Sequence, residues 1–262
     1  MQQTSVEQRF ICPNCAADSL AIDESKIECK DCGRSYEVRN GIPVFREGPA
    51  HFHWGVQSEK FGEVARAADR IGWHDAMMEF LSETPPEEAV LAWNRTLGPR
   101  RLALNMLLPL HSDAHVLDVG SGWGTISANI APFCKQVVSM DQLSEHLEYL
   151  RAVCQARGIE NISFVQTGDT NHLPFPDDSF DIAIMNGVLE WVASNSEGEP
   201  EEVQQRFILE IARVLKPSGV LYIGIENRWN YRYFLGGQEG HIRMKYGALL
   251  PRFATDLYLR LR

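Results

Sequence analysis

The sequence predicts an α/β protein in which a doubly wound, mostly parallel sheet follows a small cysteine-rich unit and a helical linker. From residue 115 onward, short apolar runs typical of buried strands alternate with helix-like segments, as in successive βαβ units. Near the N-terminus, two C-x2-C pairs stand apart from this pattern. We therefore expect three parts: residues 1–50 as the cysteine-rich unit, 51–112 as a helical linker or cap, and 113–262 as the sheet domain.

The expected elements follow from periodicity and from glycine and proline signals. Apolar residues recur at helical intervals within residues 61–81, Pro85-Pro86 interrupts them, and a further helix is expected over 99–108. In the sheet domain, the expected strands are 115–120, 136–141, 161–169, 180–187 and 220–226. The expected helices are 126–134, 144–158, 201–217 and 251–261.

Composition excludes several classes of protein. The 262 residues, 44% hydrophobic and 23% charged, suffice for one large domain with an appendage and a sizeable core. A formal net charge of −10 disfavours general attraction to nucleic acid or to an anionic membrane. No run of 18 apolar residues occurs, and the polar N-terminus lacks the pattern of a signal peptide. We expect a cytoplasmic protein without a membrane span.

Four of the six cysteines form two C-x2-C pairs: Cys12 with Cys15, and Cys29 with Cys32. Two such pairs that converge on one ion make a tetrahedral structural zinc site with no ligand position open for catalysis. Residues 16–28 have the length of a β-hairpin, and so short a segment needs the metal for its folding energy. Two disulfides or a redox-active pair are the alternatives. The other two cysteines are expected to be small core residues.

The motif that indicates ligand binding is Asp118-Val119-Gly120-Ser121-Gly122-Trp123-Gly124, which directly follows a predicted strand and opens a predicted helix. Glycines two residues apart let the main chain turn tightly and approach a ligand without a clash from a Cβ atom. The motif departs from the G-x-G-x-x-G dinucleotide fingerprint because residue 125 is threonine and an acidic residue precedes the glycines.

Acidic residues lie at three successive predicted strand ends. Asp141 ends the second strand, 23 residues after Asp118, and its carboxylate can there accept both hydrogen bonds of a ribose diol. Asp169 follows the third strand. Because parallel strands end at the same sheet edge, the three acids predict a ligand crevice there. The alternative is that each acid is only a turn residue or a helix N-cap.

Residues 100–230 resemble the class I S-adenosylmethionine-dependent methyltransferases, whose fold is Rossmann-like. Four stretches carry the resemblance, in the family's order: VLDVGSGWGTIS, VVSMDQLSEHLEYLR, QTGDTNHLPFPDDSFDIAIMNGVLEWV and ILEIARVLKPSGVLYIGIENR. The resemblance implies an enzyme with S-adenosylmethionine as its co-substrate.

By this resemblance, the cofactor-binding residues are Asp118, Gly120, Ser121, Gly122, Gly124, Asp141, Gln142, Asp169, Thr170, Asn186 and Gly187. The glycine loop would surround the methionine part of the cofactor, Asp141 would hold the ribose hydroxyls, and Gln142 would lie beside the adenine. Asp169 and the main chain of Thr170 would bind the adenine amino group. The residues after the fourth strand would lie beneath the cofactor and face the acceptor.

The N-terminal segment, from Cys12 to about Arg46, resembles the zinc ribbon of the small methyltransferase-activator proteins. The resemblance includes Tyr36 and the run NGIPVF after it. Such ribbons occur as separate activators of tRNA and rRNA methyltransferases, or fused ahead of a methyltransferase. The resemblance implies structural zinc and allows a protein partner that binds through the ribbon.

The sequence offers three candidate general bases near predicted strand ends: Glu190, His172 and Glu226. A hydroxyl acceptor needs such a base, whereas an amine, thiolate or stabilised carbanion needs less help. Each residue also has a structural alternative: a cap for Glu190, a solvated loop for His172 and a strand-end hydrogen bond for Glu226. Many small-molecule members of the family carry L-E-H where this chain has L-E-W, so a histidine base cannot be carried over there.

Residues 227–262 differ from the rest in charge, with seven Arg or Lys, two acidic and seven aromatic residues. Such a tail can stack on bases, clamp a phosphorylated or nucleotide-linked substrate, or pack on the core. The run ENRWNYRYFLGG resembles methyltransferases that act on sugars or glycolipid-type intermediates. The family's sheet normally has two further strands after the fifth. We therefore expect this chain to be a fragment of a longer protein, and the alternative is that its sheet is completed differently.

The leading functional hypothesis is methyl transfer from S-adenosylmethionine to a small or carrier-linked metabolite, such as a sugar hydroxyl. One alternative is an RNA methyltransferase acting on an rRNA base, since ribbon-bearing rRNA guanine methyltransferases share the two-part layout. Those enzymes are expected to carry a histidine as the fourth zinc ligand, where Cys32 stands here, and the net charge makes a nucleic-acid partner a poor match. Another alternative is a non-catalytic scaffold that binds the cofactor and a partner.

Overall fold

The computed structural model describes residues 9–46, 58–96, 99–167, 172–195, 198–237 and 244–260. Contacts divide the chain into two compact units, Met1–Gly224 and Ile225–Arg262. The first unit contains the cysteine-rich segment, the helical linker and the parallel sheet, and the boundaries predicted within it remain predictions. Among the described residues, no helix is both long and apolar enough to cross a membrane.

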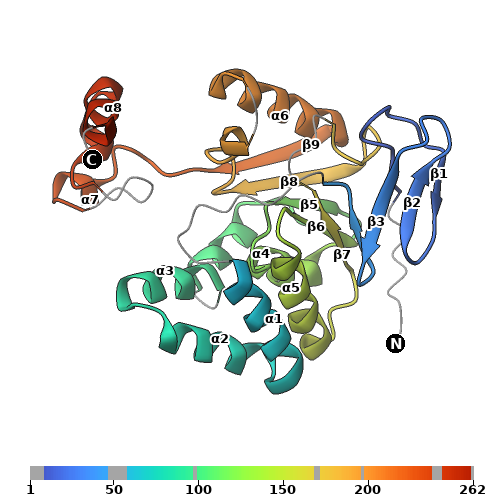
Figure 1. Ribbon diagram of the computed structural model, residues 1–262, viewed down its shortest axis with the longest axis horizontal. Helices are drawn as coiled ribbons and strands as arrows, with labels where there is room; N and C mark the ends of the chain where they lie inside the picture. The colour runs from blue at the N-terminus through green and yellow to red at the C-terminus, as the bar shows by residue number, and fades with distance from the viewer. Residues whose placement is uncertain are drawn as a thin grey trace. The chain divides into compact units, whose positions relative to one another are not determined.

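Five parallel strands form the central sheet, in the order β7-β6-β5-β8-β9. They are β5 (His115–Val119), β6 (Gln136–Asp141), β7 (Ile162–Gln166), β8 (Phe180–Asn186) and β9 (Leu215–Gly224). Figure 1 shows α4 and α5 on one side of this sheet and α6 on the other. The predicted α/β architecture with a mostly parallel sheet is confirmed. The strand order reverses at β5, so the crevice for a ligand is expected at the carboxyl ends of the strands around β5.

The helices between these strands are α4 (Thr125–Ile130), extended by a 3₁₀ turn over Ala131–Phe133, α5 (Ser144–Arg157) and α6 (Pro200–Val214). Gly158 ends α5 in the left-handed conformation (φ +64°), as its place in the sequence predicts. Helix α6 ends three residues before Pro217, and the chain is already extended at Leu215. A residue that precedes proline is forced out of the helical region, so Lys216 cannot prolong the helix.

The cysteine-rich segment forms four short antiparallel strands: β1 (Leu20–Ile22), β2 (Lys26–Cys29), β3 (Ser35–Arg39) and β4 (Ile42–Val44). The hairpin predicted between the cysteine pairs is confirmed by β1 and β2. Strand β4 then pairs in parallel with β7, with Val44 opposite Gln166, and this pairing was not predicted. The segment thereby extends the central sheet to nine strands, and Figure 1 shows its blue strands beyond β7.

Side chains also join the cysteine-rich segment to the sheet domain. Consecutive aromatic rings, with centroids 5.1 to 6.0 Å apart, run from the segment into the core of the sheet: Tyr36, Phe45, Phe10, Phe175 and Phe180. On the surface, Asn40 donates to Oε1 of Glu148 at 2.8 Å, and Arg151 donates to the carbonyl of Asn40 at 2.6 Å. Both partners of Asn40 lie on α5, so the segment contacts a helix as well as a strand of the sheet domain.

The helical linker consists of α1 (Ser58–Ile71), α2 (Trp73–Glu83), α3 (Pro86–Thr96) and a 3₁₀ helix over Pro99–Met106, within the helix predicted over 99–108. Met77 and neighbouring apolar residues of the linker belong to the hydrophobic core on the α4 and α5 side of the sheet. Tyr149 of α5 donates to the carbonyl of Trp73 at 3.2 Å. Thr125 of α4 donates to the carbonyl of Thr96 at 2.9 Å, so the end of α3 lies beside the glycine motif.

The second unit contains α7 (Tyr231–Phe234), a 3₁₀ turn (Gly247–Leu249) and α8 (Arg252–Arg260), which matches the helix predicted over 251–261. Asn230 caps α7 by accepting a hydrogen bond from the N–H of Arg232. Trp229 and Phe234 are exposed and lie roughly parallel, with centroids 6.4 Å apart, and the guanidinium of Arg228 lies over the Trp229 ring.

Candidate functional site

The loop between β5 and α4 holds its three glycines in the left-handed region, with φ of +62° at Gly120, +54° at Gly122 and +76° at Gly124. A Cβ atom on Gly120 would lie 2.6 Å from the Val188 side chain, and one on Gly124 would clash with Leu150. A Cβ atom on Gly122 would have nothing within 4 Å. Gly120 and Gly124 are therefore required for packing, whereas Gly122 borders open space where a ligand can approach the main chain.

Asp141 ends β6 beside this loop. Its Oδ2 accepts a hydrogen bond from the N–H of Gly122 at 2.7 Å, and its Oδ1 accepts one from the N–H of Leu143 at 2.9 Å. The Nδ1 atom of His146 lies 3.2 Å from the same Oδ1. Burial alone would raise the pKa of Asp141, but the charge and hydrogen bond of His146 and the two main-chain N–H groups hold it below its ordinary value. Asp141 is therefore a buried carboxylate, and His146 is a partner that the sequence did not point out.

Asp118 does not face the open side of the loop. It is buried, and its Oδ2 accepts a hydrogen bond from Ser127 at 2.6 Å, while Ser127 also lies 2.6 Å from the hydroxyl of Ser139. Asp118 precedes the last residue of β5, and its carboxylate is buried against Ser127 of α4. The structure therefore brings Asp118 close to the site as a support for the loop and the first turns of α4.

Near Asp141, Oγ of Ser121 and Oε1 of Gln166 are buried and make no hydrogen bond with any residue that the structure describes. The N–H of Ser121 donates to the carbonyl of Met140, which holds the loop against β6. The amide of Gln166 donates from Nε2 to the carbonyl of Gln142 at 2.9 Å. A buried polar atom without a partner is costly, so both atoms suit a bound polar ligand. Ser121 was predicted, but Gln166 was not.

The end of β8 contributes Asn186 and Gly187 to the same sheet edge. Gly187 is left-handed (φ +73°), and its N–H donates to the carbonyl of Gly224 at 2.8 Å. A Cβ atom on Gly224 would clash with the side-chain oxygen of Asn186, which lies directly across from it. Three residues after Gly187, Oε2 of Glu190 is buried without a hydrogen-bond partner in the described part of the chain. Glu190 thus offers an acceptor atom close to a predicted cofactor-binding glycine.

The other predicted residues lie elsewhere or outside the described residues. His172 is only partly exposed, and its Nδ1 lies 3.0 Å from Oε2 of Glu210, which belongs to the last turns of α6. Glu226 is exposed in the second unit and accepts a hydrogen bond from Tyr233. Asp169 and Thr170 lie outside the described residues. The structure therefore brings together Ser121, Gly122 and Asp141, whereas His172 contacts Glu210.

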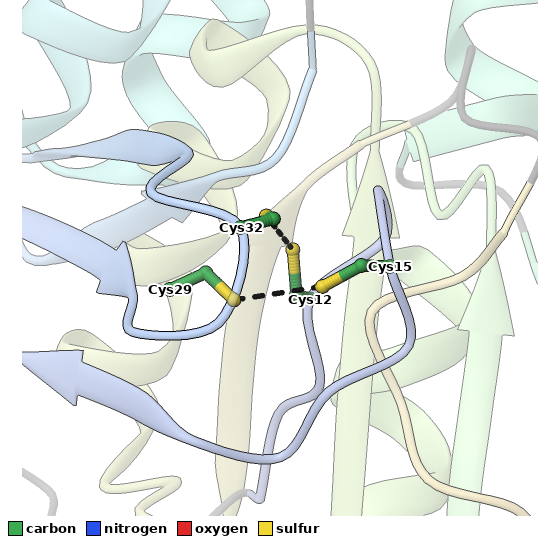
Figure 2. A group of neighbouring side chains, drawn as sticks. All are labelled: Cys12, Cys15, Cys29 and Cys32. Carbon is green, nitrogen blue, oxygen red and sulfur yellow. Dashed lines mark hydrogen bonds between the residues drawn. The ribbon is translucent and has the colours of Figure 1, made fainter.

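The four predicted metal ligands converge at one end of the cysteine-rich segment, as Figure 2 shows. All four sulfur atoms lie within 4.8 Å of one another, with Cys12 and Cys32 at 3.7 Å and Cys15 and Cys29 at 3.6 Å. None of the four is in a disulfide, and Cys12 also contacts the hydroxyl of Tyr36 at 3.2 Å. The remaining two cysteines, Cys134 and Cys154, are buried in the core, as predicted.

The clustered thiols differ in acidity. The main-chain N–H of Arg34 lowers the pKa of Cys32 to about 6. For Cys15, the main chain of Ala17 acts to lower the pKa, but desolvation and hydrogen bonds with the other three cysteines raise it to about 12. Sulfur atoms this close resist simultaneous ionisation, and a bound divalent cation removes that repulsion. The cluster therefore suits a cation held by four thiolates.

Comparison with known proteins gives the glycine loop and Asp141 their context. Residues 117–223 match the family model described as "Methyltransferase domain". This part of the chain is therefore similar to a methyltransferase domain. It includes both the glycine loop and the carboxyl ends of all five parallel strands except the last residue of β9.

Curated relatives match over part of their length. The chain is 33% identical over 108 residues to the uncharacterized methyltransferase YcgJ of Bacillus subtilis, which covers 41% of this chain and 39% of YcgJ. It is 34% identical over 172 residues to the demethylmenaquinone methyltransferase of Tropheryma whipplei, which covers 65% of this chain and 59% of that protein. Among solved structures, the crystal structure of YcgJ has 29% identity and a TM-score of 0.40, covering 47% of this chain and 49% of that one. The chain thus spans less than two thirds of these relatives.

Proposed function

We propose that the protein transfers the methyl group of S-adenosylmethionine to a small or carrier-linked acceptor, such as a sugar hydroxyl. The observation that carries this proposal is the pairing of the open glycine loop with a buried, ionised Asp141, which accepts the N–H of Gly122 at 2.7 Å. A loop with three left-handed glycines and a carboxylate at the neighbouring strand end suit an amino-acid-substituted ribonucleoside.

Each part of the site has a role in this proposal. Gly120, Ser121, Gly122 and Gly124 surround the methionine part of the cofactor, with the unpartnered hydroxyl of Ser121 available to its polar groups. Asp141 binds the ribose hydroxyls, Gln142 lies beside the adenine, and Asp169 and Thr170 bind the adenine amino group. Asn186 and Gly187 lie beneath the cofactor. Asp118 acts indirectly, because its hydrogen bond to Ser127 supports the loop.

Methyl transfer is an in-line displacement at the carbon bound to the sulfonium, so the protein's main task is to hold the acceptor atom in line. When the acceptor is a hydroxyl, its proton must leave as the new C–O bond forms. Glu190 is our candidate base, because one of its oxygen atoms is buried without a partner among the described residues, close to Gly187. His172 is a weaker candidate because Glu210 already engages it, and Glu226 belongs to the second unit.

The acceptor class rests on the names of the relatives. Besides the demethylmenaquinone enzyme, the chain is 33% identical over 128 residues to the malonyl-[acyl-carrier protein] O-methyltransferase of Pectobacterium atrosepticum, covering 43% of that protein. These names support a small or carrier-linked acceptor. An RNA acceptor remains the second candidate, since the exposed Trp229 and Phe234 of the second unit, beside Arg228, suit base stacking.

For the N-terminal segment, we propose a zinc ribbon (residues 1–50) with a structural zinc ion on Cys12, Cys15, Cys29 and Cys32. A tetrahedron of sulfur atoms with Zn–S bonds of 2.3 Å has edges of about 3.8 Å, close to the observed separations of 3.6 and 3.7 Å. Strand β4 of the ribbon pairs with β7, so the ribbon also contacts this chain's own sheet. Reduced thiols of this kind favour a cytoplasmic location.

A labelled-methyl transfer screen tests the function. The purified chain is incubated with methyl-labelled S-adenosylmethionine and with panels of sugars, nucleotide sugars, acyl-carrier substrates and RNA. We expect label on a small or carrier-linked acceptor, its loss in Asp141→Asn, and a strong decrease of the turnover number in Glu190→Gln without a matching loss of cofactor affinity. Label on RNA alone would favour the second candidate. Cofactor binding without transfer to any panel would favour a non-catalytic scaffold and contradict our proposal.

A further inference from the structure

The side chain of Gln166, the last residue of β7, is 7% exposed, yet its carbonyl oxygen has no hydrogen-bond partner within the described ranges. Burying an amide carbonyl without a hydrogen-bond partner is energetically unfavourable. Such a group at the carboxyl end of a strand, at the edge where α/β sheets bind ligands, therefore indicates that a ligand supplies the missing donor.

The orientation of this amide follows from its neighbours. Nε2 of Gln166 donates to the carbonyl of Gln142 at 2.9 Å. Turning the amide over would set two carbonyl oxygens against each other, so Oε1 must be the atom left without a partner. Gln166 is also directly opposite Asp141 in the β6–β7 pairing, and the N–H of Thr167 donates to the carbonyl of Asp141 at 3.0 Å.

The main chain of Gln166 is held from the other side by the cysteine-rich segment. Val44 of β4 pairs with Gln166, and the N–H of Phe45 donates to the carbonyl of Gln166 at 2.9 Å. Phe45 itself is fully buried among aromatic rings. A side chain whose main chain is held on both edges of its strand is well placed to recognise a ligand, because little freedom remains to be lost on binding.

We propose that Gln166 determines specificity for the adenine base, with Oε1 accepting a hydrogen bond from the exocyclic amino group. This inference rests on the proposed function, in which Asp141 takes the ribose and Gln142 lies beside the base. The ribose hydroxyls then bind the carboxylate, and the adenine amino group is the remaining donor of the adenosine half. The amino group carries two N–H bonds, so it can donate one to Oε1 of Gln166 and the other to the carboxylate proposed for Asp169. A base with a carbonyl at that position would face Oε1 with a second acceptor.

The test compares two ligands and two proteins by titration calorimetry. The ligands are S-adenosylhomocysteine and S-inosylhomocysteine, whose base has a carbonyl in place of the amino group. The proteins are the wild type and Gln166→Met, which keeps the length of the side chain but removes both polar atoms. We expect the wild type to prefer the adenosyl ligand, and Gln166→Met to reduce this preference by about tenfold. Gln155→Met, an exposed position on α5, is the matched control and should leave the preference unchanged.

Three other outcomes would overturn the proposal. Equal weakening of both ligands would show that Gln166 only positions the turn at Gln142. An unchanged preference would show that its carbonyl does not contact the base. A preference that survives in Gln166→Asn, whose shorter amide cannot span both partners, would exclude the contact even if Gln166→Met does not fold. If the wild type binds neither ligand, the proposed function fails instead, so the two failures are distinguishable.

Discussion

Nδ1 of His146 lies 3.2 Å from Oδ1 of Asp141, and both side chains are buried. Because the other carboxylate oxygen holds the N–H of Gly122, one side chain connects the first turn of α5 with the glycine loop that precedes α4. The two loops that border the candidate cofactor site therefore depend on the same charged group.

Replacement of Asp141 by alanine should weaken the binding of S-adenosylhomocysteine by at least about tenfold. The loss corresponds to about 1.4 kcal/mol, the contribution of hydrogen bonds to a charged group. Titration calorimetry measures it, and Asp113→Ala, which removes an exposed carboxylate before β5, is the control. Unchanged affinity in Asp141→Ala would contradict the assignment of the ribose site.

Two glycines of the same loop should respond differently to alanine. Gly124→Ala adds a methyl group against Leu150 at a left-handed position, so we expect a loss of about 2–4 kcal/mol in the free energy of unfolding. Gly122→Ala meets no neighbour within 4 Å, so its cost is only the backbone strain of about 1–2 kcal/mol. Its methyl group would instead occupy the space assigned to the cofactor.

Denaturant unfolding and ligand titration separate these two effects. Gly122→Ala should stay folded and bind S-adenosylhomocysteine at least about tenfold more weakly, whereas Gly124→Ala should have the larger loss of stability. Wild-type affinity in Gly122→Ala would contradict the assignment of the open space at Gly122 to the cofactor.

Metal analysis should find one zinc ion per chain, and Cys12→Ser should lower this content and the melting temperature together. The reason is that a short ribbon obtains most of its folding free energy from the metal. Cys154→Ser changes a buried cysteine outside the cluster, so its zinc content should equal that of the wild type. A metal content well below one in the freshly purified wild type would count against the ribbon.

Glu210→Gln should destabilise the protein at neutral pH and much less in acid. Burial alone would raise the pKa of Glu210, but hydrogen bonds from Arg213 and the N–H of Leu173 hold it below its ordinary value. A carboxyl whose pKa is lowered on folding stabilises the protein fully above its unfolded pKa, and this contribution is lost as the pH falls through its folded pKa.

Urea unfolding at pH 7 and pH 3.5 measures this dependence. The difference between the wild type and Glu210→Gln should be about 1.5 kcal/mol at pH 7 and should shrink at pH 3.5. Glu160→Gln, at an exposed position after α5, should show no such change. A difference that is equal at both pH values would mean that the charge of Glu210 contributes nothing.

The parallel strands and the glycine loop could be predicted because each depends on residues that are close together in the sequence. A buried strand such as β6 is recognisable from its own residues, without knowledge of its neighbours. The glycines that adopt left-handed conformations are part of the motif, so the motif alone predicts the loop. The cysteine spacing likewise predicted the cluster of sulfur atoms. In each case the interacting residues are close in sequence or carry a specific chemical signature.

Contacts between distant segments could not be read in this way. Val44 and Gln166 are paired although more than a hundred residues separate them in the sequence, and neither side chain is specific to such a pairing. The sequence allowed His172 to be a solvated loop residue, because nothing near it in the chain indicates the contact with Glu210 of α6. Gln166 was overlooked because an isolated glutamine at a strand end has no recognisable pattern, and its significance appears only when its oxygen is seen buried beside Asp141.

The pairing of β4 with β7 has a consequence for the behaviour of the protein in concentrated solution. Without β4, the carboxyl end of β7 would be an exposed edge of the sheet. Unpaired N–H and C=O groups at such an edge can form hydrogen bonds with strands of other molecules. With β4 in place, the edge strand on this side is β1, which has only three residues and therefore offers few main-chain groups for pairing with another molecule. The segment that contains the four cysteines thus also covers this sheet edge, and we expect a preparation in which the segment unfolds to form aggregates.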